Sequence, residues 1–147
     1  MFKKSLAVLF ALLFTFSFGT MAFASENDAD SAKGLEIIEK ANIEIDELIA
    51  NAVEEGTKLH ADYQITAQEL ALDTTYEGQQ KAAAAEADYN AQLDELIIKL
   101  QDKAVELTNK GIEEAAAYGV YGQCVWKLVQ IADRSVWVDP IQVIGWT

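Results

Sequence analysis

The fold of this chain is decided by residues 38–52, which read IEKANIEIDELIANA. Apolar side chains recur there at steps of three and four, and acidic side chains occupy many of the positions between them. This spacing continues to residue 70 and keeps one apolar stripe on a single helix face for about nine turns. The stripe consists of Ile38, Ala41, Ile45, Leu48, Ala52, Gly56, Leu59, Tyr63, Ala67 and Leu70. We therefore expect a long helix that packs lengthwise against a partner, weakened in the middle by Gly56.

A second run with the helical period follows the turn-forming residues 73–78 and ends near Gly119. Two striped helices joined by a short turn bury their apolar faces by folding back on each other. This arrangement predicts an antiparallel hairpin about 60 Å long. Thr66 and Glu69 also read as a capping box, so a break at residues 63–66 and a compact three-helix bundle remain an alternative.

Two helical segments share a similar order of residues, namely 42–49 (NIEIDELI) and 90–97 (NAQLDELI). An ancient duplication would produce this likeness. Acidic amphipathic helices also share such short sequences by chance, and few residues are identical when the alignment is extended beyond these two segments. The likeness is therefore a weak signal by itself.

After residue 118 the pattern becomes typical of strands. Residues 124–131 and 136–138 are rich in β-branched and aromatic side chains, and a polar turn separates them. Pro140 ends the second strand because it has no N–H to donate, and residues 141–146 can supply a third. A small β unit is only marginally stable on its own in water, so it should pack against the helices. We expect a mainly α fold with a C-terminal unit of two or three antiparallel strands.

The free edge of this β unit has two predicted outcomes. Residues 141–146 fold back to cover it in a closed three-stranded unit, or the exposed edge recruits a strand from a partner. The expected organisation is a helical part at 31–119 and a β unit at 120–147.

The N-terminal residues 1–24 have the pattern of a cleaved signal peptide. Two lysines precede an apolar run at 6–18, and the small-x-small pattern before Ser25 places the cleavage site between Ala24 and Ser25. The run is shorter than the roughly 20 residues of a transmembrane helix. The signal resembles bacterial ones. We expect a secreted, extracellular protein that begins with a polar leader at 25–30 and has no stable membrane anchor.

The chain is strongly acidic, with a formal charge of −13. Signal cleavage removes Lys3 and Lys4 and makes this charge more negative by two. Binding to nucleic acids and anionic lipids requires clustered Lys and Arg, so we expect both to repel this chain and expect no nucleic-acid partner. The expected partner is an unidentified protein or cell-wall component. Self-association through the helix stripe or a strand edge stays open.

The residues that bind metals or cofactors elsewhere are not arranged for it here. Asp28, Asp30 and Glu39 match positions 1, 3 and 12 of a calcium-binding EF-hand loop, but Ala32 and Lys33 occupy positions that need a ligand and a glycine. Calcium binding should therefore be weak and nonspecific. We expect no cofactor and no specific metal site.

Catalytic patterns fail on similar grounds. His60 is the only histidine, and a di-iron motif would need a glutamate where Thr57 stands. No nucleophile signature accompanies His60, which is expected to be a half-exposed helix residue. Adjacent acidic residues on a helix face different directions, and a helical hairpin offers no deep cleft between two carboxylates. The sequence therefore predicts a protein that is not an enzyme.

The C-terminal unit holds the remaining candidate site residues, Trp126, Trp137 and Trp146. A short strand unit has few other large side chains to bury, so the tryptophans are expected to form its core. If they are exposed, they form a surface for a carbohydrate or peptide ligand. Cys124 is the only cysteine, so it has no intramolecular disulfide partner, and it is expected to be buried.

The sequence predicts an exported, acidic, non-enzymatic interaction or structural protein of the cell surface or extracellular medium. The alternative is a carbohydrate- or peptide-binding module that uses the tryptophan-rich β unit.

Overall fold

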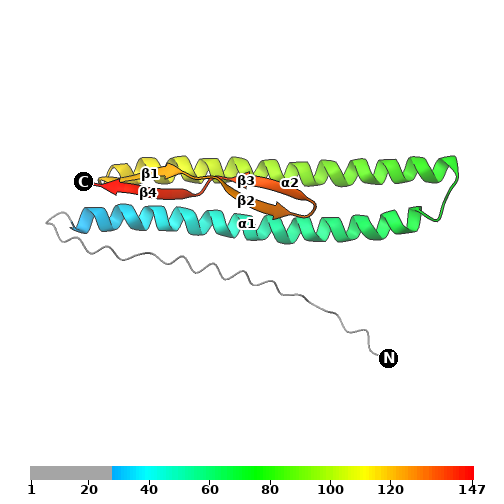
Figure 1. Cartoon of the computed structure of the whole chain (residues 1–147), viewed down its shortest axis with the longest axis horizontal. Coiled ribbons are helices and arrows are strands. Elements are labelled where there is room, and N and C mark those ends of the chain that lie inside the picture. The colour runs from blue at the N-terminus through cyan, green and yellow to red at the C-terminus, as the bar shows by residue number, and fades with distance from the viewer. Residues whose placement is uncertain (1–27) are drawn as a thin grey trace, which may run out of the picture.

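A computed structural model describes residues 28–147, which form two long helices followed by four short strands (Figure 1). The predicted signal peptide, its predicted cleavage point and the start of the predicted polar leader lie outside the described residues. The predicted mainly helical fold with a C-terminal β unit is confirmed. The elements are α1 (Asp28–Leu70), α2 (Tyr76–Ala116), β1 (Val120–Cys124), β2 (Lys127–Ile131), β3 (Arg134–Val138) and β4 (Ile141–Trp146).

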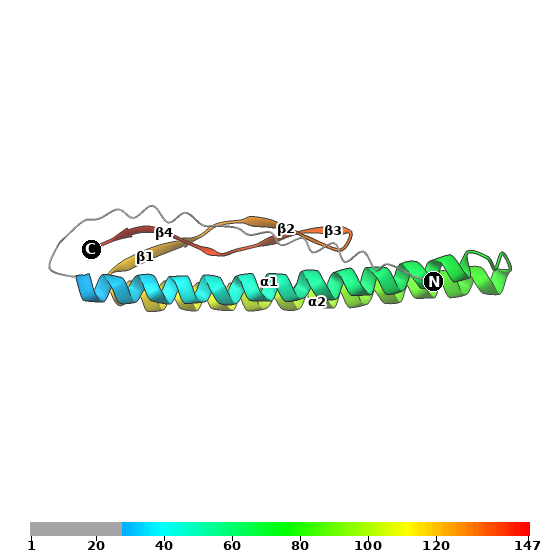
Figure 2. The ribbon, with the colours of Figure 1, turned by 90° about the horizontal axis from the view of Figure 1, so that it is seen from below.

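The two helices form an antiparallel hairpin and lie side by side along their length (Figures 1 and 2). Their apolar stripes meet in the core, where Ile45 and Leu93 are fully buried. The expected alternative, a break at residues 63–66, does not occur. The Thr66 hydroxyl donates to the carbonyl of Asp62 within a continuous helix instead of capping a new one. The three-helix alternative is therefore wrong.

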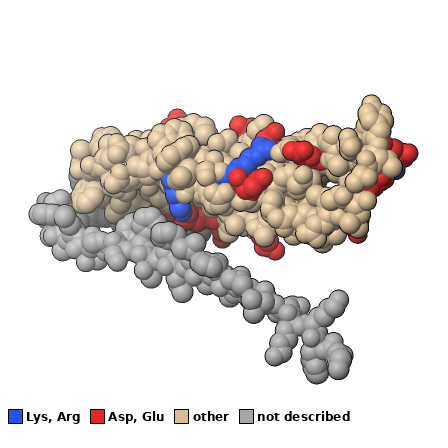
Figure 3. Space-filling model, turned by 45° about the vertical axis from the view of Figure 1, so that its right-hand side comes forward, with Lys and Arg blue, Asp and Glu red and all other residues tan. Residues whose placement is uncertain are grey.

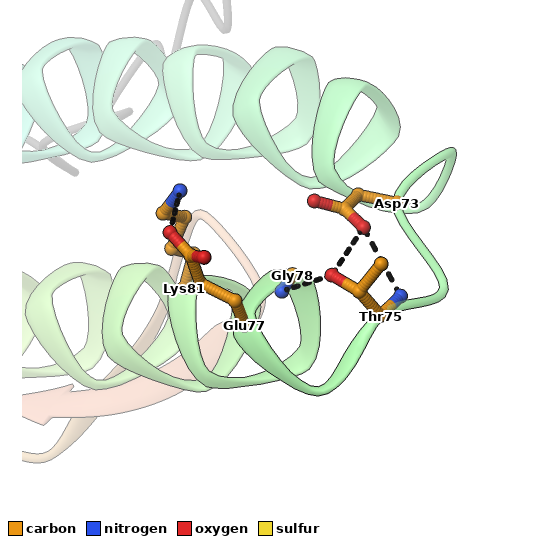
Figure 4. Close-up of polar contacts among 5 residues, drawn as sticks. All are labelled: Asp73, Thr75, Glu77, Gly78 and Lys81. Atoms are coloured by element: carbon orange, nitrogen blue, oxygen red, sulfur yellow. Dashed lines mark hydrogen bonds and ion pairs between the residues drawn. The ribbon is translucent and has the colours of Figure 1, made fainter.

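A short loop with a defined hydrogen-bond pattern joins the helices (Figure 4). The Thr75 hydroxyl accepts from the Gly78 N–H at 3.1 Å and caps α2. The Asp73 carboxylate accepts from both the hydroxyl and the N–H of Thr75, and these bonds lower the pKa of Asp73. A Cβ on Gly78 would lie 2.4 Å from the Asp73 carboxyl carbon, so this turn requires glycine.

The four strands form successive halves of one long two-stranded ribbon. β1 pairs with β4 and β2 pairs with β3, both antiparallel. Sequence analysis missed β1, which begins directly after Gly119, a residue with φ of 74° that turns the chain out of the helix. Since β4 pairs with β1 and not with β2, the predicted closed three-stranded unit is wrong. The predicted stop at Pro140 is confirmed, because β3 ends at Val138.

The ribbon lies against one side of the helical hairpin and contacts both helices (Figure 2). Its twist carries each edge across the hairpin, so that β1 packs mainly on α2 while β2 packs on α1. The opposite edge crosses the other way, with β3 on α2 and β4 mainly on α1. The helix-facing side of the ribbon consists of small β-branched residues that are buried in the core: Val120, Val129, Ile131, Val136, Val138 and Ile141.

Glycines in the helices allow this close approach. A Cβ on Gly56 would lie 2.6 Å from Cγ2 of Ile131, and one on Gly111 would lie 2.7 Å from Cδ1 of Ile141. Gly56 was expected only to weaken the helix. In the structure it is the position that receives the end of the ribbon, which explains a glycine in a helix interior.

Helix side chains also hydrogen-bond to the main chain of the β3–β4 edge. The Asn42 amide donates to the carbonyl of Ile141 at 2.9 Å and accepts from its N–H at 2.8 Å. The hydroxyl of Thr108 donates to the carbonyl of Asp139, and Gln101 donates to a carbonyl of β3 at 3.1 Å. The helices therefore satisfy main-chain polar groups of this edge at Trp137, Asp139 and Ile141.

The two similar helix segments make equivalent contacts with the ribbon. Asp46 of the first binds Lys127 at 2.9 Å, and Asp94 of the second binds Arg134. Asn90 accepts a further hydrogen bond from Arg134 at 2.7 Å. Each segment thus contributes apolar residues to the core, Ile45 and Ile49 in the first and Leu93 in the second, and one carboxylate to a ribbon cation.

Candidate binding surface

The outward side of the ribbon carries large exposed aromatic residues. Trp126 is 68% exposed and Trp137 is 53% exposed, and both line one open cleft. Leu128 lies opposite Trp137 in the strand register and is also exposed. The expectation that the tryptophans form the core of the β unit is therefore wrong for Trp126 and Trp137, and Trp146 is not a core residue either.

The reason lies in the register and in the space beneath the ribbon. Side chains alternate between the two faces of a strand, and Trp137 stands between the inward-facing Val136 and Val138. The helices approach the ribbon so closely that glycines are needed, which leaves room for valine and isoleucine but not for an indole. Trp146 lies at the end of β4 opposite Val120 and is 48% exposed, well separated along the ribbon from the other two tryptophans.

The other end of the outward side carries a second apolar group. Tyr121 and Ile144 are exposed there, next to an irregularity in the register of β1 and β4. Between the two apolar groups, Gln123 faces Gln142, with 3.4 Å between the two amide groups. We call the outward residues of the ribbon the aromatic face: Tyr121, Gln123, Trp126, Leu128, Gln130, Ser135, Trp137, Gln142 and Ile144.

The aromatic face contains no charged residue, although the chain is strongly acidic. Of all the acidic residues, only Asp133 and Asp139 follow the helices, and Lys127 and Arg134 balance them. Figure 3 views the side that carries the ribbon, where uncharged atoms cover most of the described surface and the charges gather in a few places. The negative charge of the protein is therefore segregated onto the helices.

A polar network fastens the turn of the ribbon to the helices. The Tyr89 hydroxyl donates to Asp133 at 2.8 Å and lies 2.9 Å from Nδ1 of His60, while Gln64 contacts the other nitrogen of His60. Tyr63 stacks on Tyr89 with 4.6 Å between ring centroids. Burial and the bond to Asp133 raise the pKa of Tyr89 to about 12. A phenol held in its protonated form suits anchoring better than proton transfer at neutral pH.

Cys124 is exposed, so the prediction that it is buried is wrong. It is the last residue of β1, at the place where the ribbon crosses between the helices. Partial burial and the nearby Asp139 carboxyl raise the pKa of the Cys124 thiol, and burial raises the pKa of Asp139. A raised pKa favours the thiol over the reactive thiolate. Cys124 therefore has the properties of a poor nucleophile.

Within residues 28–147, no group of three His, Cys, Asp or Glu side chains is placed to hold a metal ion. In the same part of the chain, neither helix has an apolar stretch of the length and purity needed to cross a membrane. Asp46 and Asp94, each of which has an adjacent glutamate in the sequence, bind Lys127 and Arg134 of the ribbon.

Sequence analysis missed most of the aromatic face beyond the tryptophans. Gln130 and Gln142 each stand between two β-branched residues, an alternation that could have identified them as outward positions of their strands. Tyr121 and Gln123 had no such signal, because Gly122 interrupts the pattern and conceals β1.

Comparisons of this chain with protein families, with curated proteins and with solved structures found no match.

Proposed function

We propose that this protein is an exported, non-enzymatic binding module of the cell surface or extracellular medium. The aromatic face holds the ligand, and the acidic helical hairpin is a stiff scaffold that presents it. The observation that carries this proposal is the joint exposure of Trp126 and Trp137 on an uncharged sheet face. Contiguous exposed apolar surface on a soluble protein marks an interaction site.

The energy available at this face fits a specific interaction. A buried indole contributes 150–250 Å² of contact surface, and about two-thirds of that area is still exposed on Trp126 and about half on Trp137. Covering both would gain on the order of 6 kcal/mol at about 25 cal/mol per Å². Hydrogen bonds to the neighbouring amides would add to this gain.

The arrangement of the rest of the protein supports a binding role over self-association through the helices. Where the ribbon covers the hairpin, the apolar stripes of α1 and α2 pack against each other and against the ribbon. The outer helix faces are acidic and would repel a second copy. The chemistry beside the face also favours binding over catalysis, since the pKa values of Tyr89 and Cys124 are raised away from neutrality.

A binding assay on the producing cells tests the proposal. The exported protein is incubated with isolated cell envelopes and with insoluble extracellular material, and the bound fraction is measured after sedimentation. The double variant Trp126→Ala/Trp137→Ala should lose at least tenfold in affinity. The matched control Trp146→Ala removes an exposed tryptophan outside the cleft and should bind as the native protein does. Circular dichroism establishes that both variants fold. Equal binding by the folded double variant would contradict the proposal.

A further inference from the structure

We infer that the ligand of the aromatic face is a linear, uncharged glycan that lies along the ribbon. This inference rests on the proposed binding function and names the class of ligand. It is carried by the shape of the face, by the order of its side chains and by the distribution of charge.

The shape of the face favours a slender ligand. Two strands about 5 Å apart make a strip roughly 10 Å wide, and the ten residues from 121 to 130 extend it to about 30 Å. Two such strips packed face to face would bury on the order of 600 Å², well below the roughly 1,200 Å² of a small stable interface. A second copy of this chain is therefore a poor occupant, whereas an extended polymer fits the strip.

The order of side chains along the strip matches the surface of a sugar chain. A pyranose ring has an apolar C–H face, which stacks on an indole or phenol, and a rim of hydroxyl groups. Trp126 and Trp137 offer the stacking platform at one end, and Tyr121 offers a second at the other. Gln123 and Gln142 lie between them, and a glutamine amide can both donate to and accept from hydroxyls.

The spacing of these groups requires several sugar units. The Leu128–Trp137 pair and the Gln123–Gln142 pair are five positions apart on each strand, which corresponds to about 16 Å. A mono- or disaccharide can occupy only one of the two groups, and an oligosaccharide of several units spans both. Affinity should therefore rise with chain length.

The charge distribution argues for an uncharged chain. The aromatic face has no cation to pair with a carboxylate or phosphate. Lys127 and Arg134, the ribbon's two cations, are both held by helix acids. The acidic helices on either side would repel a polyanion. An extended peptide would bind through main-chain hydrogen bonds at a strand edge and not on the outward side chains of the face. At the β3–β4 edge, Asn42, Thr108 and Gln101 already bond to the main chain.

The test measures tryptophan fluorescence and titration calorimetry on the exported protein with defined oligosaccharides. The probes are cellohexaose, N-acetylchitohexaose and mannohexaose, the corresponding disaccharides, and a hexamer of galacturonic acid as the anionic comparator. At least one neutral hexasaccharide should bind, at least tenfold more tightly than its disaccharide, and should shift the emission to the blue. Trp126→Ala/Trp137→Ala should abolish this binding, Gln123→Ala/Gln142→Ala should weaken it about tenfold, and Trp146→Ala should leave it unchanged.

Further results separate this inference from the proposed function. Periodate treatment of the cell envelopes should remove tryptophan-dependent binding, and protease treatment should leave it intact. Binding that survives periodate but not protease identifies a peptide or protein ligand, which overturns the glycan inference and keeps the binding function. Failure of all three neutral hexasaccharides to bind at millimolar concentration, or equal binding of the galacturonate hexamer, also overturns the inference. Envelope binding that does not depend on Trp126 and Trp137 overturns both proposals.

Discussion

Substitution of Gly56 by alanine should destabilise this protein, although the same change stabilises most helices. Alanine in a helix interior gains about 1 kcal/mol over glycine. Here the new Cβ would lie 2.6 Å from Cγ2 of Ile131, and Leu93 lies only 3.7 Å from it. Ile131 is fully buried and has little room to move away. Overpacking of a filled core costs about 1–3 kcal/mol, so the expected net loss is about 1 kcal/mol.

Thermal and urea unfolding, followed by circular dichroism, measure this effect. A loss of about 1 kcal/mol should lower Tm by about 3–6 °C in a domain of this size. The control Asn51→Ala lies on the exposed face of the same helix and should raise stability by about 0.5 kcal/mol through helix propensity alone.

A double-mutant cycle with Ile131→Ala tests the cause. With the Ile131 side chain removed, the alanine at position 56 has space and should become stabilising by up to about 1 kcal/mol. If Gly56→Ala raises Tm in the native background as Asn51→Ala does, the ribbon does not press on the helix at this position and the reasoning is wrong.

Three further predictions concern the contacts that hold the ribbon. Asn42→Ala removes two hydrogen bonds to the main chain of β4 and should lower the free energy of unfolding in urea by about 2 kcal/mol; an unchanged midpoint would show that solvent replaces them without loss. The raised pKa of Tyr89, about 12, means that the folded state keeps this proton after the unfolded state has lost its own. Stability should therefore fall from about pH 10 to pH 12, by about 2–3 kcal/mol more in the native protein than in Tyr89→Phe. Burial raises the pKa of Asp139, so its contribution is fully present at acidic pH and is lost as the carboxyl ionises. Asp139→Asn should accordingly gain stability relative to the native protein as the pH rises from 3 to 8, and parallel pH profiles would contradict this.

The sequence was a good guide to the helices and a poor one to the outward side of the ribbon. Helical periodicity over many turns is a strong signal, and the hairpin follows from the need to bury two stripes. Helical periodicity gives no information on whether the tryptophans of the ribbon are buried. Side-chain size indicated a core, but the glycines at 56 and 111 make the ribbon approach too close for an indole. That spacing depends on contacts between residues far apart in the chain, which local patterns do not record.

Sequence analysis missed β1 for the same reason, because this strand also depends on contacts between residues far apart in the chain. β1 has a glycine in the middle and is stabilised by β4, whose partner residues lie about twenty positions later. The weak likeness between segments 42–49 and 90–97 was in contrast informative. Both segments bind cations of the ribbon, so the likeness corresponds to a shared structural role.

The ribbon ends at its turn near Gly56 and Tyr89, so the hairpin has two mechanically different halves (Figure 1). In the covered half, each edge of the ribbon crosses from one helix to the other and so holds the two helices together. The helices there cannot separate unless the strands are sheared off both of them. Beyond the turn, only helix–helix contacts oppose separation, and several large apolar side chains such as Ile65 and Leu72 are exposed. Amide hydrogens of the outer half should therefore exchange through local opening, while those beneath the ribbon exchange only when the whole protein unfolds.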